Sequence, residues 1–368
     1  MSPLLLCLAA SAWPLRGPNN VVTDREVSTE ILLSEASLVT TDTVVTDPVA
    51  LAAVAASALS YLESPPESDP GGVHAGLFAE LGVSLDDVRA TLAFVIRVAE
   101  EDAAAGTNRL ADPVFLADNF RLIQWKPDLE GATARGHTLP SDRIRMTRYL
   151  VYQFLGSPVR TQTYSHALYA VPEDDACRTR YTRMEVIGGI YTDNPDGCAA
   201  EPLVWLTRRG VFEAMMQGTI EVTLPDGSAA LFNVARPNEM PYDPAIRDPT
   251  QQKRYWYFAQ VDGVMGWGPA PPDKVRLRPH VSVAGDVYNL GLGKLLALRS
   301  NEELRLVVLS DTGGAFQPNL FQLDFFVGGY PSRASFIEGT KALPSMVEAG
   351  VLIWEPRVTV IDAQVPVP

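Results

Sequence analysis

The spacing of apolar residues changes at about residue 140, and this change constrains the fold more than any other feature. Beyond it, apolar and polar residues alternate in short runs that end at Gly, Pro, Asn or Asp, as β-strands do. The clearest runs are TRYLVYQF, EVTLPDGSAALFNV, RYWYFAQV, KLLALRS and ELRLVVLS. The Asp226-Gly227 pair inside the second run is typical of a hairpin turn. We therefore expect a body made mainly of β-strands, and the 29 prolines and 27 glycines agree with many turns.

The segment before this body follows a helical period instead. Ser84 and Asp87 have the spacing of a helix-starting capping box. The apolar residues that follow recur on one face of a helix, at Val88, Leu92, Val95, Ile96 and Ala99. The sequence thus predicts a helical N-terminal region over residues 48–140.

The first residues have the pattern of an export signal. Residues 1–20 contain the apolar run Leu4–Ala12, which ends in small residues of the kind found at cleavage sites. Cys7 leaves lipidation open as an alternative. Residues 21–47 are polar and rich in Thr, Val and Asp, so we expect an extended tether.

Two further cysteines, Cys177 and Cys198, lie in loop-like sequence. In an oxidising compartment they could form a disulfide, and two unpaired thiols are the alternative, because spacing alone does not give their distance.

Charge and motifs exclude several kinds of function. The net charge of −14 disfavours binding to nucleic acid or to anionic lipid. The four histidines have no metal-ligand spacing and no Cys-x-x-Cys is present, so we expect no metal. GLGKLL lacks the first glycine of a phosphate loop and has Leu295 where Ser or Thr would bind magnesium, so we expect no nucleotide cofactor. Carboxylates remain as the candidate chemical groups.

Two aspartates interrupt the last apolar runs. In FQLDFFVGG, alternation places Asp324 between phenylalanines and on the same strand face as Gln322 and Phe326. Partial desolvation there would raise its pKa, as a general acid requires near neutral pH. Asp311 precedes Thr-Gly-Gly and can accept N–H groups of that turn. A turn-capping Asp311 and a water-facing Asp324 on a strand edge are the structural alternatives.

These two residues lie in DTGGAFQPNLFQLDFFVGG, which resembles the signature of the MltA-type lytic transglycosylases. Thr147 and Tyr149 stand where that family has Thr-Gly-Tyr-Tyr. Other stretches agree with the family in order: TRMEVIGG, PLVWL, FEAMMQG, TLPDGS, RYWYF and SVAGDVYNLGLGKLLAL. The resemblance covers roughly residues 50 to 356.

The resemblance implies an α+β fold, mainly β with the helical N-terminal region. Residues 141–160 and 265–358 would form a double-psi β-barrel, and residues 161–264 a second, inserted β domain. A glycan strand would lie in the groove between the two domains. Five aromatic residues could stack on sugar rings or simply pack in cores: Trp205, Tyr255, Trp256, Tyr257 and Trp267.

The resemblance also implies an activity. Such an enzyme cleaves the MurNAc–GlcNAc β-1,4 bond of peptidoglycan and forms 1,6-anhydro-MurNAc, with one aspartate as acid and then base. Asp324 takes that role, and Asp311 orients the turn or holds the environment of Asp324. The substrate-binding residues implied are Thr147, Tyr149, Gln217, Gly218, Gly313 and Gly314.

The same resemblance implies glycan strands as the partner, a monomer, no metal or other cofactor, and the periplasm or outer membrane of a Gram-negative bacterium, including outer-membrane association. The sequence departs from the family pattern at Arg148 and Leu150, in place of glycine and tyrosine, and at Thr219-Ile220, in place of Ser-Gly. These departures support an alternative, a catalytically degenerate peptidoglycan-binding protein. The acidic, helical N-terminal third leaves a further alternative, an envelope scaffold.

Overall fold

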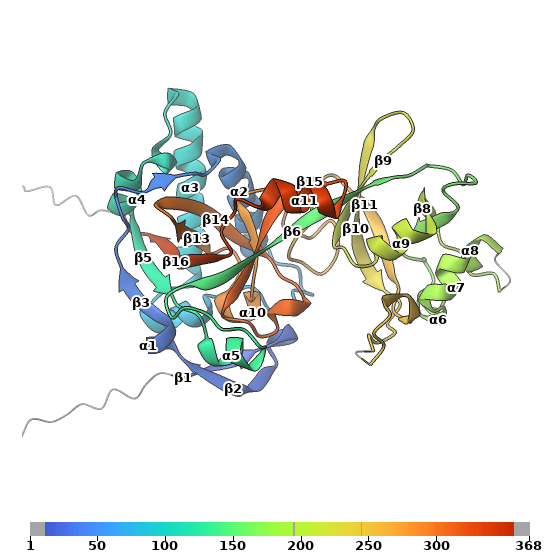
Figure 1. Cartoon of the computed structure of the whole chain (residues 1–368), viewed down its shortest axis with the longest axis horizontal. Coiled ribbons are helices and arrows are strands. Elements are labelled where there is room, and N and C mark those ends of the chain that lie inside the picture. Colours follow the sequence, from blue (N-terminus) through green and yellow to red (C-terminus); the bar gives the residue numbers. More distant parts are fainter. Residues whose placement is uncertain (1–11, 194–195, 244, 357–368) are drawn as a thin grey trace, which may run out of the picture.

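One long strand, β6 (Ile144–Leu155), connects the two lobes of the molecule (Figure 1). The computed structural model describes residues 12–193, 196–243 and 245–356. The large lobe and the small lobe each have their own apolar core, and the core of the small lobe is built from residues 167–258. The chain thus folds around two hydrophobic centres that share a continuous strand.

A twelve-stranded mixed sheet runs through both lobes, in the order β11-β10-β9-β6-β15-β12-β14-β13-β16-β5-β3, with β4 beside β14. Six of its strands close into a ring, because β16 also pairs with β6. The other five strands of this ring are β15 (Gln322–Tyr330), β12 (Ser282–Ala284), β14 (Glu303–Asp311), β13 (Leu295–Ser300) and β16 (Met346–Trp354). The β6–β15 and β12–β14 pairs are parallel, whereas the others in the ring are antiparallel. The chain is therefore a mixed α/β protein with a closed ring of strands in its large lobe.

Residues 21–47 do not form the expected tether. They fold into β2 (Val22–Ser28), α1 (Thr29–Leu32), β3 (Leu33–Ala36) and β4 (Thr43–Val44). Their few apolar side chains supply the reason, because Val27, Leu32 and Leu33 are buried in the large core. Strand β3 pairs with β5 (Phe120–Trp125), and β4 pairs with β14.

The end of the predicted signal-like segment is also folded. Residues 12–16 form β1 (Ala12–Arg16), which pairs with β2, and a short 3-10 turn, η1 (Pro18–Asn20), follows. Residues 1–11, with Cys7, lie outside the described residues.

Two helices, α2 (Pro48–Glu63) and α3 (Leu85–Ala105), pack together against the large lobe (Figure 1). The Ser84–Asp87 capping box is present, so the predicted helix start is confirmed. Val88, Leu92, Val95 and Ala99 are buried as the periodicity predicts. The short helix η2 (Gly76–Leu81) lies between them in the chain, and η3 (Arg109–Ala111), α4 (Pro113–Asn119) and α5 (Leu129–Ala134) follow α3, with the sheet strand β5 between α4 and α5. The segment 48–140 is thus not helical throughout.

The small lobe combines strands with short helices. Strands β9 (Thr219–Thr223), β10 (Ala229–Pro237) and β11 (Trp256–Val261) extend the large sheet, and the Asp226-Gly227 turn joins β9 to β10 as predicted. Strands β7 (His166–Tyr169) and β8 (Pro202–Leu206) form a separate pair. The helices are α6 (Asp175–Arg180), α7 (Arg183–Gly188), α8 (Ile190–Asp193) and α9 (Arg208–Ala214).

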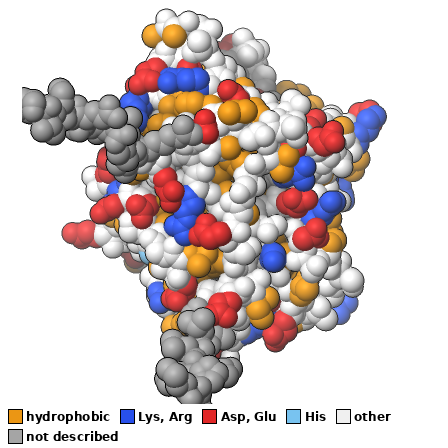
Figure 2. Space-filling view, turned by 90° about the vertical axis from the view of Figure 1, so that its left-hand side faces the viewer, with side chains coloured by type: hydrophobic (Ala, Val, Ile, Leu, Met, Phe, Trp, Pro, Cys, Tyr) orange, Lys and Arg blue, Asp and Glu red, His pale blue; other side chains and the backbone are white. Residues whose placement is uncertain are grey.

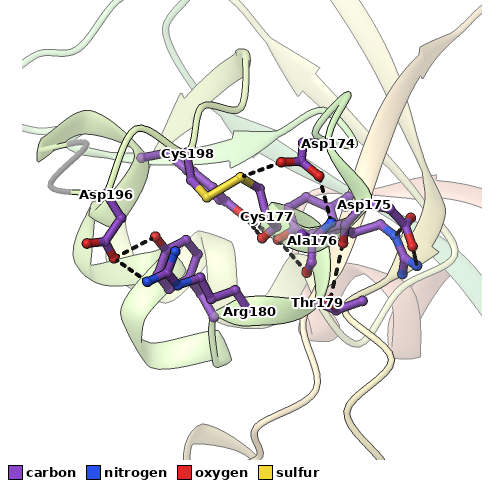
Figure 3. The surroundings of a disulfide bond; sticks show 12 residues. Asp174, Asp175, Ala176, Cys177, Thr179, Arg180, Asp196 and Cys198 are labelled. Carbon is purple, nitrogen blue, oxygen red and sulfur yellow. Dashed lines mark hydrogen bonds and ion pairs between the residues drawn. A yellow bond between two sulfur atoms is a disulfide. The ribbon is translucent and has the colours of Figure 1, made fainter.

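A disulfide joins Cys177 in α6 to Cys198, and its two Cα atoms are 5.5 Å apart (Figure 3). Both cysteines are buried in the core of the small lobe. Asp196 lies beside this link, where it pairs with Arg180 at 3.1 Å and accepts a hydrogen bond from Tyr181 at 3.2 Å. The pairing left open by the sequence is therefore present in the structure.

The end of the large lobe that faces away from the small lobe carries interspersed acidic and basic side chains, with small hydrophobic groups between them (Figure 2). Among the described residues, no helix is both long enough and apolar enough to span a membrane.

Candidate active site

A cleft of about 440 Å³ lies beside β6, where this strand passes from one lobe to the other. The large lobe lines the cleft with Tyr149, Asp311 and Asp324, and the small lobe with residues 216–219 and 233–234. The segment that returns from β11 to β12 supplies further lining residues, among them Trp267 and Lys274. The two predicted carboxyl groups therefore face the same space between the lobes.

Strand register explains why the two aspartates meet. Ala284 of β12 pairs with Asp311 of β14 on one side and with Asp324 of β15 on the other. Residues opposite each other on neighbouring strands project from the same face of a sheet. The small side chain of Ala284 lies between the two carboxyl groups and also lines the cleft.

Asp324 is partly buried, as the alternation of its strand predicts. Leu323 and Phe325 are fully buried in the large core, while Asp324 lines the cleft on the other face. Burial raises the pKa of Asp324 to about 6, and Arg145 opposes this shift. Strand β15 lies between β12 and β6, so Asp324 is not on a water-facing strand edge.

Asp311 is both a turn cap and a cleft residue. One carboxylate oxygen accepts the N–H of Thr312 at 2.8 Å, and the other accepts the hydroxyl of Tyr149 at 3.0 Å. Burial raises the pKa of Asp311 to about 6, although these hydrogen bonds and Lys274 favour its charged form. Asp311 therefore caps the turn, as the structural alternative predicts, and also lines the cleft.

The structure brings together most, though not all, of the predicted substrate-binding residues. Tyr149, Gln217, Gly218 and Gly313 line the cleft. Thr147 and Gly314 do not line it.

Thr147 and Gly314 lie elsewhere in the structure. The hydroxyl of Thr147 donates to the carbonyl of Leu323 at 3.1 Å and accepts from Gln322 at 3.0 Å, so it braces the strand of Asp324. Gly314 is exposed at the start of the short helix η5 (Gly314–Phe316).

A polar cluster that the sequence did not reveal joins the lobes beside the cleft. Lys274 donates to the side-chain oxygen of Asn233 at 2.7 Å, and Asn233 donates to the hydroxyl of Thr219 at 2.8 Å. Thr219 also accepts the N–H of Met265 at 3.1 Å. The Thr219 that departs from the family pattern thus fastens the returning segment to the small lobe. No local signal marks Lys274, which lies in the proline-rich stretch GPAPPDKV.

Leu150, another departure from the family pattern, lines the cleft, whereas Arg148 and two of the aromatics have structural roles. Arg148 does not line the cleft and donates to the carbonyls of Leu343 and Pro344. Tyr255 and Tyr257 are fully buried in the small lobe. Of the five candidate aromatics, Trp267 lines the cleft, and its ring nitrogen donates to Asp69 at 2.8 Å.

In the part of the chain that the structure describes, no group of three or more His, Cys, Asp or Glu side chains is arranged to hold a metal ion.

Of the comparisons with known proteins, only the comparison with solved structures gives matches. No protein-family model and no curated protein matches the sequence. The structure of a membrane-bound lytic murein transglycosylase from Agrobacterium tumefaciens superposes with a TM-score of 0.54 at 18% identity, covering 89% of this chain and 98% of that one. The structure of E. coli MltA with bound chitohexaose has a TM-score of 0.54 at 17% identity and covers 88% of this chain and 95% of that one. The structure of MltA from Neisseria gonorrhoeae in a monoclinic form has a TM-score of 0.53 at 16% identity and covers 94% of this chain and 98% of that one. Across nearly its whole length, this chain has the MltA fold.

Proposed function

We propose that this protein is a lytic transglycosylase that cleaves the MurNAc–GlcNAc β-1,4 bond of peptidoglycan. One observation carries the proposal: Asp324, a partly buried carboxyl with a raised pKa, lines a cleft between two lobes whose fold is that of MltA. In this proposal the closed ring of six strands is a double-psi β-barrel, with the small lobe inserted into it. The glycan strand lies in the cleft.

Asp324 acts first as the acid. Its protonated carboxyl gives its proton to the glycosidic oxygen, the bond from that oxygen to C1 of MurNAc breaks, and positive charge develops at C1 and the ring oxygen. The resulting carboxylate then takes the proton of the MurNAc 6-hydroxyl as O6 bonds to C1. The products are a 1,6-anhydro end and a free 4-hydroxyl, so no water is consumed and Asp324 recovers its proton.

Asp311 has a supporting role in this scheme. Its hydrogen bonds from Thr312 and Tyr149 fix its carboxylate beside Ala284, and a negative charge there stabilises the positive charge that develops on the sugar. Tyr149, Gln217, Gly218 and Gly313 contact the glycan directly. Thr147 and Gly314 act indirectly, Thr147 by holding β15 and Gly314 by shaping the turn after Asp311.

The proposed location follows from the proposed substrate. Peptidoglycan lies in the periplasm, and we place the protein there or at the outer membrane, as a monomer. The Cys177–Cys198 disulfide supports an oxidising compartment of this kind.

The experiment is digestion of purified sacculi, with mass spectrometry of the soluble products. The proposal predicts muropeptides that end in 1,6-anhydro-MurNAc and take up no ¹⁸O from labelled water. Reducing-end products that contain ¹⁸O would instead indicate a hydrolase. Protein that sediments with sacculi and releases nothing would establish the alternative, a glycan-binding protein without activity.

A further inference from the structure

Lys274 is distinctive because it is the one Lys or Arg residue among the described residues that line the cleft. The charged groups around it there are Asp311 and Asp324. A glycan that enters the cleft therefore meets two acidic groups and a single cation.

The charge of Lys274 is held in place but not paired. Its ammonium donates to the Asn233 side chain at 2.7 Å and to the Val234 carbonyl at 3.2 Å, and both acceptors are neutral. Within the described ranges, no carboxylate forms an ion pair with Lys274. Burial lowers the pKa of Lys274 to about 8, and Asp311 opposes this shift, so the amine is still mostly protonated at pH 7.

An ammonium has three donors, and two of them are used by β10 of the small lobe. The third donor remains for a group that enters the cleft, and Asp311 acts on the ammonium only from beyond ion-pair distance. A partly desolvated cation is costly unless an anion pairs with it. A substrate carboxylate would accept the third N–H of Lys274 and pair with its positive charge.

We propose that Lys274 binds a carboxylate of the substrate, so that the cleft prefers glycan strands whose sugars carry a free acid near the cleaved bond. This inference rests on the proposed function. It narrows the substrate class from glycan strands in general to anionic ones, such as peptide-free strands whose MurNAc units have a free lactyl carboxylate. Asn233 and Val234 position the lysine, and Lys274 makes the contact.

The test measures binding to two probes that differ only in charge. One probe is peptide-free glycan strands of defined length, and the other is the same strands with each lactyl carboxylate converted to its N-methylamide. Binding is measured by calorimetry in an Asp324→Asn background, so that nothing is cleaved. We expect the carboxylate probe to bind about tenfold or more tightly than the amide, as hydrogen bonds to charged groups allow.

Three variants distinguish the loss of the proposed Lys274–carboxylate contact from a general loss of folding. Lys274→Met should abolish the preference for the carboxylate, whereas Lys274→Arg should keep part of it. Arg276→Met is the matched control, because Arg276 is exposed on the same segment, is paired with Asp262 at 2.7 Å, and does not line the cleft. This control should keep the full preference.

A second measurement covers the case in which Lys274→Met fails to fold. Raising NaCl from about 20 to 300 mM should weaken binding of the carboxylate probe severalfold and leave the amide probe nearly unchanged, because salt screens a partly exposed ion pair. Equal affinity for the two probes, or a preference that survives in folded Lys274→Met, would overturn the inference alone if wild type still releases anhydro products. Binding of neither probe, with no anhydro products, would overturn the proposed function as well.

Discussion

Tyr149 of β6 donates a hydrogen bond of 3.0 Å to Asp311 at the end of β14, although the two strands are not paired with each other. The bond therefore spans the closed ring of strands at the cleft. Burial and the nearby charges of Asp311 and Asp324 raise the pKa of Tyr149 well above its usual value, so its hydroxyl stays a donor at neutral pH. One hydroxyl thus holds Asp311 in place beside the proposed acid.

The Tyr149→Phe variant should cleave sacculi more slowly than wild type. The change removes one hydrogen bond to a charged group, and we expect a loss of about tenfold to a hundredfold in kcat/KM. The fold should survive, because a phenylalanine ring at this position would still pack against Phe326, whose ring centroid lies 5.1 Å from that of Tyr149. Turbidity loss of sacculi and a thermal melt measure the two effects, and unchanged kcat/KM would contradict the role given to this bond.

The rate should depend on pH through Asp324. The proposed acid must be protonated, and its pKa of about 6 means that kcat/KM falls tenfold per pH unit above this value. Below pH 6 the rate should fall as well, because Asp311, whose pKa is also about 6, loses its negative charge. Asp311→Asn should keep this alkaline fall, because Asp324 is still present. A rate that rises through pH 6 to 8 would be incompatible with Asp324 as the acid.

The buried ammonium of Lys294 should make the stability of the protein depend on pH. Its side chain is 1% exposed, it donates to the His74 carbonyl at 3.3 Å, and burial lowers its pKa to about 7. Between pH 7 and the unfolded value of 10.5, the unfolded chain binds more protons than the folded one, so stability rises with pH across this window.

Lys294→Met removes the ammonium that burial disfavours. The lowering of the pKa from 10.5 to about 7 corresponds to about 4 kcal/mol at pH 7, so we expect the variant to be more stable than wild type by up to this amount at pH 7 and to lose the advantage toward pH 10. Urea unfolding followed at pH 7 and pH 10 measures both values. A variant less stable than wild type at pH 7 would show that the packing of Lys294 matters more than its charge.

Breaking the disulfide should weaken the small lobe selectively. Cys177 and Cys198 close a short loop within the core of that lobe, and a link of this length typically contributes about 2–4 kcal/mol. Because the large lobe has a separate core, its own unfolding should change little in a Cys177→Ser, Cys198→Ser double variant. Limited proteolysis with peptide mapping resolves the lobes, and equal protection of residues 167–258 in both forms would refute the prediction.

The sequence predicted the features that depend on local patterns. Alternation in FQLDFFVGG was enough to place Asp324 on the face opposite Leu323 and Phe325, and the capping box located the start of α3. The Asp226-Gly227 turn was equally local.

The features that the sequence missed depend on distant partners. Strands β3 and β4 look like a polar tether because each is short, and their partners, β5 and β14, lie far along the chain. The contact of Lys274 with Asn233 spans 41 residues and joins a proline-rich loop to a strand. Thr147 lies in register with Asp324, but its hydroxyl is used by Leu323 and Gln322, which no pattern in the strand reveals.

The most direct test of the central claim is the yield of 1,6-anhydromuropeptides from sacculi treated with Asp324→Asn protein, beside wild type and Asp311→Asn. Asparagine keeps the size of the side chain but cannot donate and reclaim a proton near neutral pH. The account predicts that wild type releases these products, that Asp311→Asn releases fewer, and that Asp324→Asn releases none above the buffer blank while remaining folded. Release by Asp324→Asn at the wild-type rate would contradict the account.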